Sequence, residues 1–495
     1  MQKGKVYLIG AGPSDAGLLT LKGKEVLEKA DVVVYDALVS PEILTFIKDT
    51  AKTINVGKRA NNHAKTQDEI NHILLEEAQK DRVVARLKGG DPFLFGRGGE
   101  ELELLVEHNI PFEVIPGVTS SIAVPAYNGI PVTHRDCTSS VHIITGHRKE
   151  NSLRSIDFSA LVNTGGTLVF LMGRAALEGI CEGLLLAGID KDTPAALLEN
   201  GTTAKQRKVI ATVETLAQKA KDFTKTPAII VVGDVCSYAN QFNFYEKLPL
   251  FGKHVLVPRP LAMQSTLSTR LSELGAQVLS LPTIKIVPFE LNNDKILTQT
   301  FENLDVYNWI VLTSPSGVSV FFNTLQKANK DIRSVAHCKF AVLGNGTKKA
   351  LMEKGIFADI APTTFNSENL LEQIIAKIPR SNKILLPRAK KGDPHFSETL
   401  RENGYLVNDV AIYDTVNADN DLFKEHLSKV DYVMFTSASS VKGYMEMVGE
   451  KSNPPIIAIC IGEKTATVAR NYGLDTYVSK QATLDSMIEL LKTFK

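Results

Sequence analysis

The chain has 495 residues, which suggests roughly two to four domains, and its 44% of apolar residues are enough to fill several cores. Its 56 basic and 55 acidic side chains leave a formal charge of +1, which excludes a generally cationic nucleic-acid binder. No stretch reaches the roughly 20 apolar residues of a membrane span, no signal-peptide core is visible, and the five cysteines have no metal-site spacing, so we expect a cytoplasmic protein with reduced thiols and no metal site.

Short apolar segments alternate with helical patterns along most of the chain. Such segments are typical of parallel strands covered on both faces, so the sequence predicts an α/β fold. The strands are expected at 6–10, 31–36, 82–87, 141–146, 167–172 and 228–235, and then at 254–259, 309–314, 340–345, 383–388, 432–437 and 457–462. We place a first domain at 1–244, with two lobes that divide near 116–120, a connector at 245–253 and a second domain at 254–495.

The loop GAGPSD follows the first expected strand and resembles part of a dinucleotide-binding motif. That motif needs a third glycine where Asp15 stands, and it needs backbone N–H groups that Pro13 lacks. Asp15 instead places a carboxylate where a helix N-terminus is capped. We therefore expect a cap rather than a phosphate site, beside a cationic or zwitterionic ligand. A tight strand-to-helix turn without a ligand is the alternative.

A second glycine-rich segment, RLKGGDPFLFGRGGEE at 86–101, directly follows another expected strand. Gly89 and Gly90 allow the backbone to approach a flat ligand, and Asp91 can face a positive charge. A structural turn is the alternative, although such turns do not require this many charged residues. The basic side chains that we expect to meet carboxylates are Arg86, Lys88 and Arg97.

These motifs, together with VVVYDALVS, NVGKRANNHAKTQDEIN, VIPGVTSSIAVPAYNGIPVTHR, TLVFLMG and LENGTTAKQR, resemble the uroporphyrinogen-III C-methyltransferases of the tetrapyrrole methyltransferase family. The resemblance covers nearly the whole first half. It implies two α/β lobes, a homodimer, and S-adenosylmethionine bound in the cleft between the lobes. It also implies methyl transfer to C-2 and C-7 of uroporphyrinogen III, which gives precorrin-2 for cobalamin or sirohaem.

The resemblance implies a role for individual residues. Asp36 matches the family's general base, Lys58 its proton donor, and Arg59 can bind a substrate carboxylate, as can Arg86 and Arg97. Ser14 stands where the family usually has glycine, and its Cβ is expected to restrict the backbone of that loop without removing the activity. The residues that match the family's cofactor contacts are Pro13, Gly89, Gly90, Asp91, Leu94, Thr119, Ser120, Met172 and Gly201.

The second half contains an internal repeat with a shift of roughly 120–130 residues, about the size of one small lobe. WIVLTSPSGV aligns with YVMFTSASSV, and the stretch from His254 aligns with the stretch from Lys383. The repeat predicts two related lobes with a cleft between them.

The motifs LTSPSGV, VLGNGT, AIYDT, FTSASSV and IGEKTA resemble uroporphyrinogen-III synthase, which closes hydroxymethylbilane into uroporphyrinogen III with inversion of ring D. The expected fold is thus a two-lobed methyltransferase followed by an internally duplicated α/β synthase. In this family one lobe is inserted in the other, which implies lobe 1 at 254–285 and 417–495 and lobe 2 at 288–412.

Synthase chemistry requires mainly that the bilane is held in a folded shape, so we expect cleft hydroxyls rather than a catalytic triad. Tyr413 matches the family's tyrosine that helps the hydroxyl group leave. The hydroxyls expected to bind substrate are Ser314, Thr347, Thr436, Ser437 and Thr465. Helix capping by these residues, and a plain strand position for Tyr413, are the alternatives.

The leading hypothesis is therefore a bifunctional enzyme that acts on small tetrapyrroles and binds neither nucleic acid nor membrane. One alternative is that the second half is a non-catalytic module that binds a tetrapyrrole for the first half. Another alternative, which rests only on the Gly-Ala-Gly loop, is a nicotinamide-dependent oxidoreductase.

Overall fold

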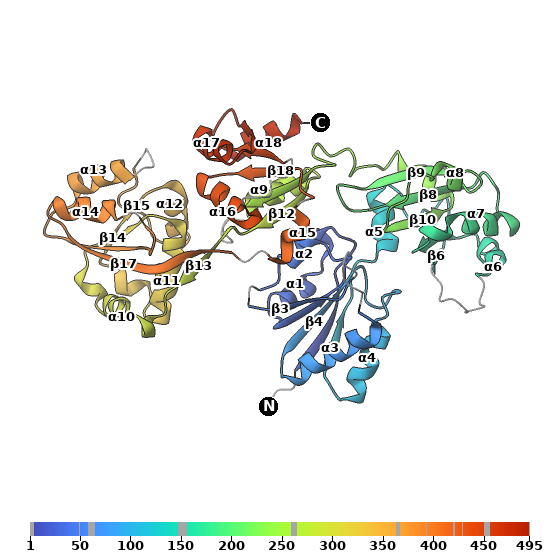
Figure 1. The fold of residues 1–495 in the computed structure, drawn as a ribbon, viewed down its shortest axis with the longest axis horizontal. Helices are drawn as coiled ribbons and strands as arrows, with labels where there is room; N and C mark the ends of the chain where they lie inside the picture. The colour runs from blue at the N-terminus through green and yellow to red at the C-terminus, as the bar shows by residue number, and fades with distance from the viewer. Residues whose placement is uncertain are drawn as a thin grey trace.

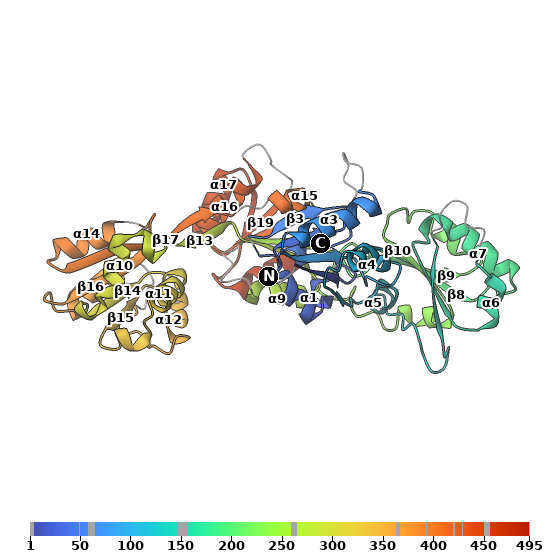
Figure 2. The same ribbon diagram turned by 90° about the horizontal axis from the view of Figure 1, so that it is seen from below.

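A computed structural model describes residues 4–48, 50–57, 65–146, 156–258, 265–362, 367–392, 394–418, 421–427, 429–449 and 456–494. Within these ranges the strands form four five-stranded sheets. Each sheet with its helices is called a lobe here, numbered one to four. Figures 1 and 2 show an elongated arrangement, with the second and fourth lobes at opposite ends and the first and third lobes side by side in the middle.

The first lobe is a parallel sheet in the order β3-β2-β4-β1-β5. The central strands β2 and β4 are buried on both faces, which explains the unbroken apolar sequence of β2, whereas β4 also carries the buried Arg86 and Lys88. Its strands are β1 (Lys5–Gly10), β2 (Val32–Tyr35), β3 (Lys52–Asn55), β4 (Val83–Lys88) and β5 (Phe112–Ile115), and its helices are α1 (Leu21–Leu27), α2 (Pro41–Leu44), α3 (Gln67–Gln79) and α4 (Gly98–Glu107).

The second lobe has the strand order β6-β7-β10-β8-β9, and only β6 and β7 are parallel. The expectation of parallel strands is wrong here, because burial on both faces produces apolar segments whatever the strand direction. Its strands are β6 (Val141–Thr145), β7 (Thr167–Leu171), β8 (Pro194–Glu199), β9 (Arg207–Thr212) and β10 (Ala228–Val232), and its helices are α5 (Ser120–Tyr127), α6 (Phe158–Asn163), α7 (Leu177–Leu186) and α8 (Leu216–Lys219).

The third lobe is a parallel sheet in the order β12-β11-β18-β19-β20, built from two separate stretches of the chain. Its strands are β11 (His254–Pro258), β12 (Gln277–Leu281), β18 (Tyr432–Phe435), β19 (Ile457–Cys460) and β20 (Asp475–Val478). Its helices are α9 (Ser265–Glu273), α15 (Lys424–Leu427), α16 (Ala438–Val448), α17 (Glu463–Asn471) and α18 (Leu484–Lys492).

The fourth lobe lies between those two stretches and has the order β13-β17-β16-β14-β15. β13 (Ile284–Pro288) and the long β17 (Leu406–Asn417) pair antiparallel and link the third and fourth lobes (Figure 1). The other strands are β14 (Trp309–Leu312), β15 (Lys339–Val342) and β16 (Lys383–Ala389), and the helices are α10 (Lys295–Glu302), α11 (Pro315–Lys327), α12 (Asn345–Met352), α13 (Ser367–Lys377) and α14 (His395–Glu402).

The two halves of the chain are packed against each other. Helix α2 of the first lobe contacts β12 of the third lobe, and one apolar cluster contains buried residues from both lobes, among them Ile43 and Leu279. The aromatic connector also packs on both sides: the ring of Tyr245 lies 4.8 Å from that of Tyr127 in the first half, centroid to centroid, and Leu250 is buried in a core cluster of the third lobe with Val255. No helix in the described ranges has the length and apolar character needed to cross a membrane.

Candidate functional site

A cavity of about 450 Å³ lies between the first and second lobes. Loops that follow β1, β2 and β4 form one side, and the start of α5 and the loops after β7 and β8 form the other. The nine residues that the family resemblance assigns to the cofactor all line this one cavity: Pro13, Gly89, Gly90, Asp91, Leu94, Thr119, Ser120, Met172 and Gly201. The cavity also reaches β12 of the third lobe, which sequence reasoning did not anticipate.

Glycines allow three backbone segments to meet at the floor of this site. Gly12 and Gly90 exchange backbone hydrogen bonds of 3.1 and 2.9 Å. A Cβ added to Gly10 would lie 2.4 Å from the Gly117 Cα, and one added to Gly117 would lie 2.2 Å from the Gly90 oxygen. The Gly-Ala-Gly sequence is therefore required by backbone packing, with no phosphate needed to explain it.

Asp15 forms the cap that the sequence predicts. Its Oδ1 accepts from the backbone N–H of Gly17 at 2.7 Å, and its Oδ2 accepts from the Tyr127 hydroxyl at 2.7 Å. The second contact joins the first lobe to α5. The Thr202 hydroxyl adds another connection between the lobes by donating to the Pro13 carbonyl. Next to these contacts, Ser14 has φ +96°, a value that favours glycine.

Asp91 is engaged by the backbone on both of its oxygens. Oδ1 accepts from Phe93 and Leu94 at 2.8 and 3.1 Å, and Oδ2 accepts from Gly117 at 3.1 Å. The carboxylate thus fixes the glycine-rich loop after β4 against the loop after β5. Its negative charge lies on the cavity wall, where a cationic ligand gains from it.

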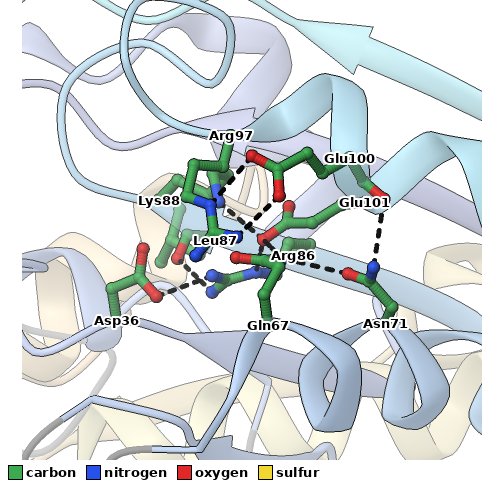
Figure 3. A network of polar contacts seen from close by, with 9 residues as sticks. All are labelled: Asp36, Gln67, Asn71, Arg86, Leu87, Lys88, Arg97, Glu100 and Glu101. Carbon is green, nitrogen blue, oxygen red and sulfur yellow. Dashed lines mark hydrogen bonds and ion pairs between the residues drawn. The ribbon is translucent and has the colours of Figure 1, made fainter. Parts of the chain in front are cut away.

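A buried charge network holds Asp36 at the end of β2 (Figure 3). Arg86 is 2% exposed, and it donates to Asp36 at 2.7 Å and to Glu101 at 3.0 Å. Lys88 donates to the same Glu101 at 2.6 Å, and burial, with Arg86 nearby, lowers the pKa of Lys88. The assignment of Arg86 to a substrate carboxylate is corrected here, because the guanidinium is already held by two carboxylates of the protein.

Glu101 is the central residue of this network, and sequence reasoning did not identify its role. It is fully buried in the first turn of α4, where a carboxylate is favoured by the helix dipole. The sequence signal that could have identified it is the pair Arg86 and Lys88 on β4. Side chains two positions apart on a strand lie on the same face of the sheet. A buried pair of cations needs a buried carboxylate nearby.

Arg97 does not line the cavity. It precedes α4 with φ +59°, and it donates to the exposed Glu100 at 2.9 and 2.6 Å. Its expected contact with substrate is therefore not supported by its position. Lys58 and Arg59 lie outside the described residues.

In the fourth lobe, the structure brings Ser314 and Tyr413 together. Their hydroxyl oxygens are 3.0 Å apart, and the Ser314 hydroxyl also accepts from the backbone N–H of Gly317 at 2.9 Å, so it caps α11. Tyr413 is buried. Ser314 therefore caps α11 and also forms a hydrogen bond with the Tyr413 hydroxyl.

The remaining expected hydroxyls lie after the carboxyl ends of parallel strands. Thr347 lies in α12, which follows β15, and it is buried. In the third lobe, Thr436 and Ser437 follow β18, and Thr465 lies buried in α17 after β19. Ser437 caps α16 by accepting from the backbone of Ser440 at 3.2 Å.

Comparison with known proteins assigns each half of the chain to a protein family. The family model of tetrapyrrole (corrin/porphyrin) methylases matches residues 5–217, and that of uroporphyrinogen-III synthase HemD matches residues 265–489. The porphyrin biosynthesis protein HemD of Ruminiclostridium josui is 46% identical over 99% of this chain and 98% of its own. The S-adenosyl-L-methionine-dependent uroporphyrinogen III methyltransferase of Methanosarcina barkeri is 51% identical over 47% of this chain and 92% of its own.

A solved structure is similar to part of the chain as well. Uroporphyrin-III C-methyl transferase from Thermus thermophilus, complexed with S-adenyl homocysteine, is 38% identical, covers 47% of this chain and 99% of its own, and superposes with a TM-score of 0.41. The chain belongs to the same family as HemD of R. josui, and it combines an S-adenosylmethionine-dependent tetrapyrrole methyltransferase with a uroporphyrinogen-III synthase in one polypeptide.

Proposed function

We propose that the carboxy-terminal half closes hydroxymethylbilane into uroporphyrinogen III and that the amino-terminal half methylates this product at C-2 and C-7 to give precorrin-2. The observation that carries the proposal is the convergence of nine assigned residues on one cavity between the first and second lobes. The two reactions are consecutive, so the product of one half is the substrate of the other.

The cavity fits S-adenosylmethionine by its backbone-rich wall and its negative charge at Asp91. Gly90 has φ +69°, and a Cβ there would meet nothing within 4 Å, so a flat ligand can approach the backbone. Thr119, Ser120 and Met172 complete the opposite side. When bound, S-adenosylmethionine supplies a methyl group attached to a positively charged sulfur.

Asp36 is proposed to act on the tetrapyrrole substrate as a general base. The pyrrole carbon that gains the methyl group becomes part of a cationic ring, and that ring must then lose a proton. A carboxylate stabilises the cation and accepts the proton. Arg86 fixes Asp36 through Oδ1, and among the residues that the structure describes none is hydrogen-bonded to Oδ2, the oxygen proposed to act on the substrate. Lys58, which lies outside the described residues, remains the candidate proton donor.

In the synthase half, the Ser314–Tyr413 hydroxyl pair is proposed to assist departure of the bilane hydroxyl. The pyrrole electrons expel the hydroxyl, and a proton from Tyr413 converts it to water. Ring D then attacks the resulting azafulvene through its substituted carbon, and the bond from that carbon to its existing bridge carbon breaks. The freed bridge carbon bonds to the other α-carbon of ring D, ring D loses the proton there to become a pyrrole again, and Tyr413 regains a proton from solvent. Ser314 would orient the tyrosine hydroxyl from a fixed helix cap. Thr347, Thr436, Ser437 and Thr465 are proposed to hold the bilane.

A single reaction tests both activities. The purified full chain is given hydroxymethylbilane and S-adenosylmethionine, and the products are separated by isomer and by methyl content. We expect the type III isomer and its dimethylated product. Type I isomer alone would reject the synthase and favour a binding module, and unmethylated type III isomer would reject the methyltransferase.

We also propose a homodimer formed through the methyltransferase half, and action in the cytoplasm. The homodimer follows the family resemblance, and the five unpaired cysteines support a reducing compartment. Light scattering of the purified chain measures its mass, and a monomer across the working concentration range would reject the dimer.

A further inference from the structure

One side chain of the synthase half lies between the two lobes of the methyltransferase. Gln277 begins β12, and it lines the cofactor cavity. Its Nε2 donates to Glu42 Oε1 at 3.0 Å, and Glu42 belongs to α2 of the first lobe. Its Oε1 accepts from the backbone N–H of Ala204 at 3.3 Å, and Ala204 lies between β8 and β9 of the second lobe.

The side-chain amide of Gln277 is therefore hydrogen-bonded to both sides of the cleft. Within the methyltransferase, Asp15–Tyr127 and Pro13–Thr202 also join the first lobe to the second-lobe side of the cleft. Gln277 differs from these because it comes from the other enzyme. A donor and an acceptor on one rigid planar group fix the separation of their two partners.

Further residues of the third lobe extend this contact. His254, Leu279 and Lys429 line the cavity beside Gln277. Apolar packing between α2 and β12 holds the strand in place, since the two elements are in contact and Ile43 and Leu279 share one buried cluster. The strand that carries Gln277 is thus anchored on the first lobe by burial as well as by hydrogen bonds.

We propose that the third lobe is a third wall of the methyltransferase cofactor cleft and that Gln277 is a positioning residue that sets the separation of the first and second lobes. The inference rests on the proposed cofactor site and adds a structural role for the synthase half in methyl transfer. Because coupling is reciprocal, a ligand in the cleft also stabilises the contact between the two halves.

The test is Gln277→Ala in the full chain, with S-adenosylhomocysteine as the probe in calorimetric titration. Loss of two hydrogen bonds should raise its Kd about tenfold. The KM for S-adenosylmethionine should rise similarly, while kcat at saturating cofactor and the isomer ratio of the synthase stay unchanged. Gln326→Ala, an exposed glutamine on α11 of the fourth lobe, is the matched control and should bind as the parent does.

A pair of variants separates positioning from general loss of packing. Gln277→Glu keeps the acceptor for Ala204 but sets a second carboxylate against Glu42, so it should weaken binding more than Gln277→Ala. Adding Glu42→Gln exchanges donor and acceptor and restores the pair. The double variant should bind S-adenosylhomocysteine within about twofold of the parent, well inside the loss expected for one hydrogen bond.

Hydrogen exchange is a second measurement, and it is made on the unmodified chain. Its result therefore does not depend on whether a variant folds. S-adenosylhomocysteine should slow exchange of the β12 amides, 277–281, and leave the β15 amides, 339–342, unchanged. Unchanged β12 exchange, or a parent-like Kd for Gln277→Ala, would overturn the inference while the cofactor site stands. Absence of any binding to the parent chain would reject the cofactor site itself.

Discussion

Arg86 Nη2 lies 2.7 Å from Asp36 Oδ1, and the Nε of the same guanidinium lies 3.0 Å from Glu101 Oε1. The guanidinium is buried, whereas the Asp36 side chain is 31% exposed. A buried cation therefore holds a partly exposed carboxylate at the end of β2, in a fixed orientation. Such an arrangement holds one carboxylate oxygen in a charge-assisted hydrogen bond while the side chain stays partly exposed.

Asp36→Asn should slow methyl transfer by about 100-fold or more, because the amide cannot accept a proton. The Kd for S-adenosylhomocysteine should stay within about twofold of the parent, since Asp36 does not line the cofactor cavity. Single-turnover methylation and calorimetry measure the two effects. Asp222→Asn, at an exposed position, is the control. Unchanged turnover of Asp36→Asn would remove this residue from the mechanism.

Gly90→Ala should raise the Kd for S-adenosylhomocysteine by at least about tenfold, because a side chain at φ +69° is strained and projects beside the cofactor. Gly99→Ala, which has open space and no positive φ, should bind normally. Isothermal titration of both variants makes the comparison. Equal affinities would place the ligand away from the Gly-Gly-Asp loop.

Ser14→Gly should stabilise the amino-terminal half by about 1 kcal/mol, because relief of strain at φ +96° exceeds the entropy cost of glycine. Ser14→Ala retains the strain and should give no gain. Urea unfolding of both variants, followed by hydrogen exchange near Asp15, reports the difference. A destabilised glycine variant would mean that the serine side chain stabilises this loop.

Tyr413→Phe should reduce formation of uroporphyrinogen III by at least about tenfold and increase the share of type I isomer, since the proton for the leaving hydroxyl is lost. Tyr405→Phe is the control within the same lobe, because its hydroxyl donates to the Ile378 carbonyl at 2.9 Å. That variant should lose about 1 kcal/mol of stability and keep its isomer ratio. Parent-like synthesis by Tyr413→Phe would make this tyrosine a plain strand residue.

Glu77→Gln should destabilise the first lobe at neutral pH but not in acid. Burial tends to raise the pKa of Glu77, but the neighbouring Lys52, Lys80 and Arg82 outweigh it and lower the pKa to about 2 from the usual 4.5. The ionised form therefore stabilises the fold above pH 4.5, and this contribution is lost as the pH falls towards 2. Thermal unfolding midpoints of parent and variant should converge over that interval. A constant difference across it would argue against the ion pairs.

Sequence reasoning succeeded where a residue type restricts the conformation of its own backbone. Glycine and proline in the loops after β1 and β4, and Asp15 at a helix start, have narrow conformational uses, so their positions identify these loops. The direction of the second-lobe strands was not predictable in the same way, because burial on both faces gives the same apolar pattern in parallel and antiparallel strands.

The sequence by itself determined the α/β class, the internal repeat of the second half and the glycine-rich loops after β1 and β4, because these depend on local periodicity and on the conformational limits of single residues, whereas the second-lobe residues of the cavity were predicted from the family resemblance. Tertiary structure alone decided that Arg86 holds Asp36, and that Gln277 of one enzyme lies 3.0 Å from Glu42 of the other. Those partners are 50 and 235 positions apart, and local patterns carry no information about which distant side chains folding brings into contact.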